Sequence, residues 1–181
     1  MNIFEYFPTF DLGDVHLREI RISDAAAYHR YMNNNEVKEF LTQDNIPMTL
    51  DAAAEDLRYW SGIFTHRRSI YWAIVAVDTD ELIGTIGFNV WNRIHNRADI
   101  SYDLDQRFWG KGVMRRAMSQ VMKFAMEEMK IVRVQATVVI ENQRSIKLLE
   151  KSNFRQEGIL RKYEIIAGKY RDYYMYGCVK W

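Results

Sequence analysis

The sequence predicts an α/β (α+β) fold, with a mixed, mostly antiparallel central sheet of about seven strands flanked by about four helices. Three observations predict it. The 181 residues are 48% hydrophobic and 27% charged, a balance typical of globular domains. The segments follow the order strand, two helices, three strands, helix, strand, helix, two strands. Neither a repeat nor a linker interrupts the chain, so residues 1–181 are expected to form a single domain.

The first half of the chain is expected to supply a strand, two helices and a hairpin. Alternating residues at 16–20 predict the first strand. Ser23 is a candidate N-cap for a helix over 24–32, which three asparagines at 33–35 would end. Thr49 is a candidate N-cap for a helix that reaches Phe64. Segments 70–77 and 82–90 flank a polar turn and predict a β-hairpin.

The second half alternates strands and helices more regularly. Strands are predicted at 97–104, 132–139, 155–165 and 170–179, with a long helix at 113–129 and a short one at 142–151. Hairpins join antiparallel strands, whereas a crossover helix joins parallel ones. Because the chain has hairpins and two crossover helices, the sheet is expected to be mixed. The order differs from the strict alternation of a doubly wound nucleotide fold.

Composition excludes several functional classes. The sequence contains no apolar run near the roughly 20 residues of a membrane span, and it does not begin like a secretory signal, so a cytoplasmic location is expected. The single cysteine, Cys178, is expected to pack in a strand. Four scattered histidines show no metal-ligand spacing, so no metal is expected. A net charge of +1 argues against nucleic-acid binding.

The charge is unevenly distributed along the chain. Residues 1–104 hold 9 Lys and Arg against 16 Asp and Glu, whereas residues 105–181 hold 16 against 8. An acidic half and a basic half suit a site that binds a polyanionic cofactor and a cationic acceptor. Chance asymmetry without a function is the alternative interpretation.

The segment 106–113, Gln-Arg-Phe-Trp-Gly-Lys-Gly-Val, follows a strand and opens a long helix. Free N–H groups and the helix dipole make such a place an anion site, and the glycines let the backbone approach the anion. Lys111, Arg115 and Arg116 oppose the dipole, a cost that a bound polyanion would remove. The spacing matches neither a Walker A motif nor a dinucleotide fingerprint. A solvated basic face with a glycine turn is the alternative.

The motif Arg107-x-x-Gly110-x-Gly112 resembles the Arg/Gln-x-x-Gly-x-Gly/Ala signature of the GNAT acetyltransferases. The strand 98–104 is similar to the family's splayed fourth strand. The segments 109–112, 141–145, 149–154 and 157–161 resemble its ribosomal-protein N-terminal (Rim-type) branch, and the similarity covers about residues 15–179. The resemblance implies the GNAT fold and an acetyl-CoA-dependent N-acetyltransferase.

The resemblance also implies a set of cofactor-binding residues. Backbone N–H groups of the loop would hold the pyrophosphate of acetyl-CoA, at Arg107, Phe108, Trp109, Gly110, Lys111, Gly112 and Val113. Backbone atoms near Tyr102 and Leu104 would pair with the pantetheine arm, and the Asn142 side chain would hydrogen-bond it. By position alone Asn142 is a helix N-cap, and both roles can hold at once.

The implied chemistry is direct attack of a primary amine on the thioester. In the resembling branch a serine acts as general acid and a glutamate as general base, which correspond to Ser145 and Glu164 here. Tyr173 and Tyr174 are rival acids. A backbone N–H of the fourth strand, at Asp103 or a neighbour, would bind the oxyanion. The family's Glu and Gly in that strand are replaced here by Asp99 and Ser101, so Asp99 is not assigned as the base.

The acceptor is expected to be the amine of a protein N-terminus. A small amine (a polyamine, aminoglycoside or amino sugar) is the alternative, and a non-catalytic acyl-CoA sensor is a remoter one. Aromatic and histidine candidates for the acceptor side are Tyr28, Tyr31, Phe40, Trp91 and His95. The end strands could pair in a homodimer.

Overall fold

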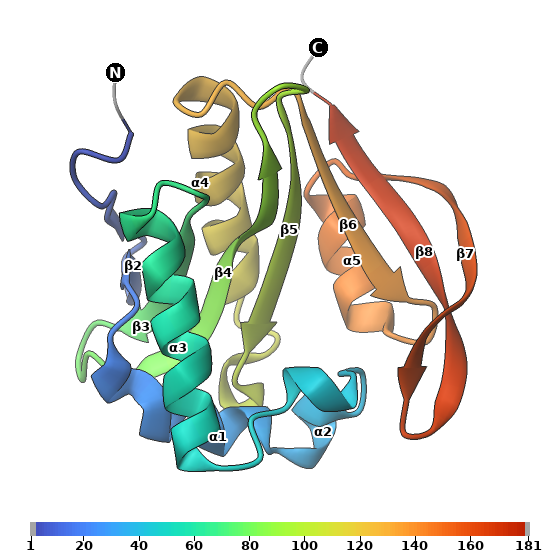
Figure 1. Cartoon of the computed structure of the whole chain (residues 1–181), viewed down its shortest axis with the longest axis horizontal. Helices are drawn as coiled ribbons and strands as arrows, with labels where there is room; N and C mark the ends of the chain where they lie inside the picture. The colour runs from blue at the N-terminus through green and yellow to red at the C-terminus, as the bar shows by residue number, and fades with distance from the viewer. Residues whose placement is uncertain (1–2, 180–181) are drawn as a thin grey trace.

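The computed structural model describes residues 3–179, which form one eight-stranded sheet and five α-helices (Figure 1). The strands are β1 Phe10–Asp11, β2 Val15–Glu19, β3 Tyr71–Ala76, β4 Leu82–Asn92, β5 Arg97–Leu104, β6 Arg133–Val139, β7 Arg155–Ile166 and β8 Lys169–Val179. The helices are α1 Ala25–Met32, α2 Asn35–Lys38, α3 Leu50–Thr65, α4 Val113–Glu127 and α5 Gln143–Lys151. None of the helices within this described part is long and apolar enough to cross a membrane.

The predicted fold class is confirmed, and the differences lie in short elements. The strand β1 was not predicted because two residues carry no readable alternation. The asparagines at 33–35 do end α1, but Asn34 then caps the extra helix α2 by accepting a hydrogen bond from the amide of Glu36. The cap predicted at Ser23 is wrong. Asp24 takes that place and accepts hydrogen bonds from Arg18 instead of capping α1.

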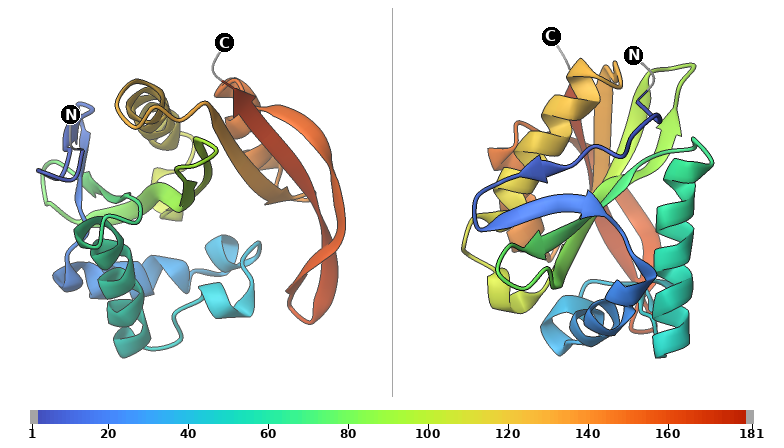
Figure 2. Two further views of the ribbon diagram at one scale, coloured as in Figure 1. Left: turned by 45° about the horizontal axis from the view of Figure 1, so that its top comes forward. Right: turned by 90° about the vertical axis from the view of Figure 1, so that its left-hand side faces the viewer.

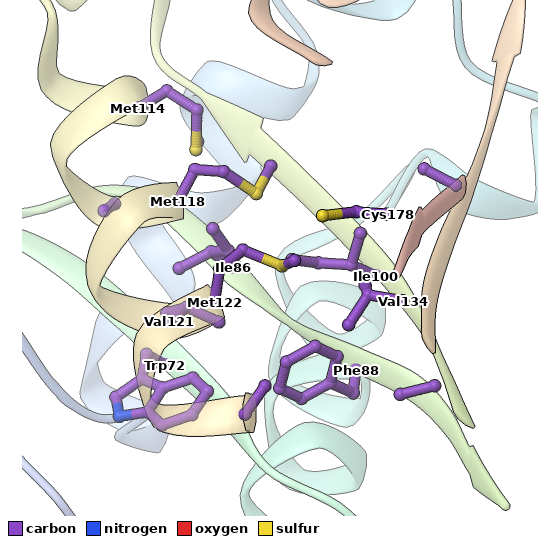
Figure 3. Close-up of a cluster of buried hydrophobic side chains, with 14 of the residues drawn as sticks. Trp72, Ile86, Phe88, Ile100, Met114, Met118, Val121, Met122, Val134 and Cys178 are labelled. Carbon is purple, nitrogen blue, oxygen red and sulfur yellow. The ribbon is translucent and has the colours of Figure 1, made fainter. Parts of the chain in front are cut away.

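Helices cover both faces of the sheet, with α1, α2 and α3 on one face and α4 and α5 on the other (Figure 2). Adjacent residues of β3 alternate between the two layers, so Trp72 packs with the α4 side chains whereas Tyr71 packs with α1 and α3. Figure 3 shows the larger core, where Met118 and Met122 of α4 face the sheet and Cys178. Cys178 is buried there, as predicted, and burial raises the pKa of its thiol.

The sheet opens between β5 and β6, the one parallel pair among the described strands. The sheet order is β1-β2-β3-β4-β5-β6-β8-β7. The β5–β6 ladder pairs only Arg97–Asp99 with Arg133–Gln135, and beyond it the two strands diverge (Figure 1). The rest of β5 therefore has one edge without a strand partner. This opening positions the site described next.

Candidate active site

A cavity of about 880 Å³ lies at the opening between β5 and β6. The diverging strands, the loop before α4, α2, α5 and the β7–β8 hairpin all contribute to it. Its volume is in the range of small-molecule sites. We define the basic wall as the lining cations of α4 and α5, namely Arg115, Arg144, Lys147 and Lys151. We define the acidic wall as the lining carboxylates of α2, β5 and β7, namely Glu36, Asp99, Asp103 and Glu164.

The glycine loop leaves unpaired N–H groups at the start of α4. Gly110 and Gly112 have φ angles of +74° and +73°, the left-handed region that favours glycine. Gly112 is the N-cap residue of α4 and offers no side chain to the first turn. Within the described residues, the amides of 110–115 donate to no protein acceptor. Because the helix dipole adds partial positive charge there, the loop is suited to an anion.

The backbone amides in the first part of the loop have acceptors within the protein. The amide of Arg107 donates to the Asp105 carboxylate (3.0 Å), and the amides of Phe108 and Trp109 donate to the carbonyls of Asp105 and Gln106. A 3₁₀ turn therefore already uses these three amides, and phosphate binding at them stays a prediction. Phe108 and Trp109 still line the cavity.

The Arg107 side chain is also engaged elsewhere. Its guanidinium donates to Asp105 (2.7 Å) and to Glu81 (2.9 Å) and does not line the cavity. Lys111 likewise lies outside the lining, over the ring of Phe108. These two side chains therefore make contacts outside the cavity, and the cations that line it come from α4 and α5.

The edge of β5 facing the opening can be deduced from its pairing with β4. The amide of Asp105 donates to the carbonyl of Ile83 of β4. Alternate residues of an antiparallel strand direct their backbone groups to the same side, so Asp103 also faces β4. The backbone N–H and C=O groups of Tyr102 and Leu104 then face the opening, where pairing with the pantetheine arm would require them; the pairing itself stays a prediction. Among the oxyanion candidates, the amide of Asp103 is disfavoured and those of its two neighbours are favoured.

Asn142 and Ser145 lie together at the start of α5. The side-chain oxygen of Asn142 (Oδ1) accepts a hydrogen bond from the backbone amide of Ser145 (3.1 Å), so the N-cap prediction is confirmed. In the described part of the chain its amide nitrogen has no partner and remains available to a ligand. The Ser145 hydroxyl is hydrogen-bonded to the phenol of Tyr102 (2.6 Å), which joins α5 to β5 across the cavity lining.

Asp103 is a half-buried carboxylate of the acidic wall. It accepts hydrogen bonds from the Tyr31 phenol (2.6 Å) and from the amide and hydroxyl of Thr85 (3.0 and 2.6 Å). Burial raises the pKa of Asp103, although these hydrogen bonds oppose the rise. Burial and the nearby Asp103 charge also raise the pKa of Tyr31.

Glu164 and Tyr173 lie together on the β7–β8 hairpin and line the cavity. A register shift between Leu160 and Glu164 bulges β7 at this point. Burial first, and then the Glu164 carboxylate, raise the pKa of Tyr173. The rival tyrosine Tyr174 packs against the larger core and does not line the cavity.

The other aromatic candidates divide between the cavity and the core. Phe40 lines the cavity, and Tyr31 contacts it through Asp103. Tyr28 is buried beside Tyr31. Trp91 and His95, at the far end of the β4–β5 hairpin, do not line the cavity, so the cavity gives their prediction as acceptor-side residues no support.

Comparison with known proteins identifies the family. The family model described as "Acetyltransferase (GNAT) domain" matches residues 14–155. The chain belongs to the GNAT acetyltransferase family. It is 32% identical to the "Uncharacterized N-acetyltransferase YoaA" of Bacillus subtilis (strain 168), over 96% of this chain and 98% of that one. It is 34% identical to the "Uncharacterized N-acetyltransferase p20" of Bacillus licheniformis, over 91% and 92%.

A solved structure shows the same fold. The ribosomal-protein-S5-alanine acetyltransferase from Vibrio fischeri superposes with a TM-score of 0.85 at 23% identity, covering 95% of this chain and 96% of that one. The chain is therefore a GNAT N-acetyltransferase, and the acetyl donor of this family is acetyl-CoA.

The residues present fit that donor. Unpaired amides at 110–115 suit the pyrophosphate, the free edge at Tyr102 and Leu104 suits an amide-bearing arm, and the basic wall suits a polyanion. Acetyl-CoA supplies an activated acetyl thioester when bound. Sequence reasoning missed Arg144, which stacks its guanidinium on Trp109 (4.2 Å to the ring centre), and the contacts of Asp103. The charge at 144 was visible in the sequence, but the stacking partner was not.

Proposed function

We propose that this GNAT enzyme acetylates the α-amino group of a protein N-terminus, with Glu164 and Ser145 as its catalytic side chains. The observation that carries the proposal is the cavity with a basic wall and an acidic wall. The basic wall and the loop amides hold the anionic donor, and the acidic wall attracts a protonated amine. The two walls approach each other where Arg144 lies 4.0 Å from Glu36.

The residues then have the following roles. The amides of 110–115 and the free amide nitrogen of Asn142 bind the donor, while Tyr102 and Leu104 offer their backbone edge to it. Glu164 accepts the proton of the acceptor amine, and its half-buried position in the cavity lining supports this role. Ser145 lies at the positive end of α5 and serves the departing thiol.

The names of relatives support a protein acceptor. The solved structure from Vibrio fischeri is named as an enzyme acting on alanine of ribosomal protein S5. The two Bacillus relatives are named only as N-acetyltransferases. A small cationic amine would also suit the acidic wall, so the test includes it. The cytoplasmic location and the homodimer stay predictions, which cell fractionation and light scattering would check.

The experiment measures CoA release with three classes of acceptor. Peptides with a free N-terminal Ala or Ser are compared with the same peptides blocked at the N-terminus but carrying an internal Lys, and with spermidine and an aminoglycoside. We expect release with the free peptides and none with the blocked ones, and mass spectrometry should place the acetyl group on the α-amine. Turnover of the small amines alone would replace the proposal with the small-amine alternative. Binding of acetyl-CoA without any turnover would favour a sensor.

A further inference from the structure

The hydrogen bond between Tyr102 and Ser145 crosses the cavity lining between β5 and α5. The two oxygens are 2.6 Å apart, and 43 positions separate the residues in the chain. Both line the cavity, at the end of β5 that faces the opening. A hydroxyl pair of this kind is suited to act on a ligand that enters the opening.

The pair has one proton left to donate. Two hydroxyl groups bring two protons, and one of them forms the bond between the two oxygens. The distance allows either oxygen to donate, and because a phenol is the stronger acid and the better hydrogen-bond donor, we assign Tyr102 as the donor and Ser145 as the acceptor. The remaining O–H group of Ser145 is then free to point into the cavity. The capping bond from Asn142 fixes the first turn of α5, and the dipole of this helix favours negative charge beside Ser145.

We propose that Tyr102 is a positioning residue that orients the Ser145 hydroxyl as a hydrogen-bond donor to the thiolate sulfur of departing CoA. The inference rests on the proposed function and adds a residue to it. When the amine nitrogen bonds to the acetyl carbon, the carbon–sulfur bond breaks and its electron pair stays on sulfur. Ser145 donates its hydrogen bond to that charge, and Tyr102 strengthens the donor because chained hydrogen bonds polarise each other.

Neither hydroxyl needs to give up its proton. Burial raises the pKa of the Tyr102 phenol, whereas an alkyl thiol has a pKa of about 8.5. The sulfur is thus the weaker base, and the protons remain on the two oxygens. The proton that finally reaches sulfur is the one that the amine loses on becoming an amide, passed through Glu164 and water. The pair therefore stabilises a charge and does not act as a full acid.

The test compares CoA with desulfo-CoA, which lacks the sulfur, and needs no acceptor. Dissociation constants of both ligands are measured by calorimetry from pH 6 to pH 9. If the site stabilises the thiolate, the pKa of the bound thiol lies below that of the free thiol. CoA affinity relative to desulfo-CoA then increases as pH rises between those two values. The other titratable groups of the cavity are the residues of the acidic and basic walls with Tyr163 and Tyr173. Their titration affects the binding of both ligands alike, so it cancels in the ratio of the two dissociation constants.

In the unaltered protein, we expect the affinity for CoA relative to desulfo-CoA to rise on the order of tenfold between pH 6 and pH 9. Tyr102→Phe and Ser145→Ala should each lose most of the rise while still binding desulfo-CoA, which shows that they are folded. Tyr176→Phe is the matched control, because it removes a buried phenol that contacts Glu150 outside the cavity, and it should keep the full rise.

The inference would be overturned if Tyr102→Phe kept the full pH-dependent rise in relative CoA affinity. It would also be overturned if the relative CoA affinity of the unaltered protein did not change with pH. Failure of both ligands to bind would instead overturn the proposed function, and this inference with it. The two failures are therefore distinguishable.

Discussion

The basic wall and the acidic wall of the cavity are built in different ways. The basic wall and the free amides beside it come from two continuous segments, residues 110–116 and 142–151. The acidic wall collects single side chains from α2, β5 and β7, which are far apart in the sequence. Backbone sites need glycine at particular places and leave a motif, whereas side-chain sites need only the right fold around them. The donor is thus easier to infer from this sequence than the acceptor.

The largest expected effect concerns the acidic wall. Glu164→Gln keeps the size of the side chain but removes the proposed base, so the acetylation rate should fall by about 100-fold or more. Affinity for acetyl-CoA, measured by calorimetry, should not change, because the basic side binds the donor. Glu157→Gln on the same strand is the control, since Glu157 pairs with Arg133 away from the cavity. A loss of affinity in Glu164→Gln would show that the two walls are not separate.

The second prediction concerns the glycine loop. Gly110 and Gly168 have the same φ of +74°, and a Cβ at either would meet no atom within 4 Å. Alanine should therefore strain both places alike, by about 1 kcal/mol. Gly110→Ala should weaken acetyl-CoA binding on the order of tenfold, since it places a methyl where an anion approaches the amides. Gly168→Ala should lower the melting temperature as much as Gly110→Ala does but leave acetyl-CoA binding intact. Equal weakening of acetyl-CoA binding in the two variants would show that backbone strain causes the effect.

The third prediction is a pH dependence of stability from Asp103. Its pKa is raised in the folded protein above the unfolded value of about 3.9, so the folded state holds the proton more tightly. Ionising Asp103 therefore costs stability as pH rises from about 4 through the folded pKa. Relative to Asp103→Asn, the protein should be most stable near pH 4 and lose that advantage towards pH 8. Urea unfolding at pH 4, 6 and 8 measures this, and a constant difference would contradict it.

The smallest effect is expected at Arg107. Arg107→Ala removes ion pairs to the half-buried Glu81 and the buried Asp105, so it should lower the melting temperature, but it should change acetyl-CoA affinity less than about twofold. Arg144→Ala is the comparison, because Arg144 lines the cavity and stacks on Trp109. Its loss should weaken binding several-fold by calorimetry. If acetyl-CoA affinity fell equally in the two variants, Arg107 would have to be counted among the donor-binding residues.

Much of the fold was predictable because its signals are local. Neighbouring residues are enough to predict the cap at Thr49, the hairpin turn at 78–80 and the order of the long elements. The same holds for Asn142, whose capping role needs only the next three residues. The cap at Ser23 failed because a 3₁₀ turn over Ile22–Asp24 precedes α1, and Arg18 of β2 binds the Asp24 carboxylate there. Local rules fail where a distant side chain competes for the same group.

The sequence by itself determined the order of the long elements, the glycine loop before α4 and the family, since each depends on short-range patterns. The tertiary structure decided which amides remain free, where β5 and β6 diverge, and which side chains share the cavity. Tyr31 reaches Asp103 across 72 positions, and Tyr102 reaches Ser145 across 43. Such contacts depend on the packing of two helical layers against one twisted sheet, and no local pattern records which distant side chains that packing brings together.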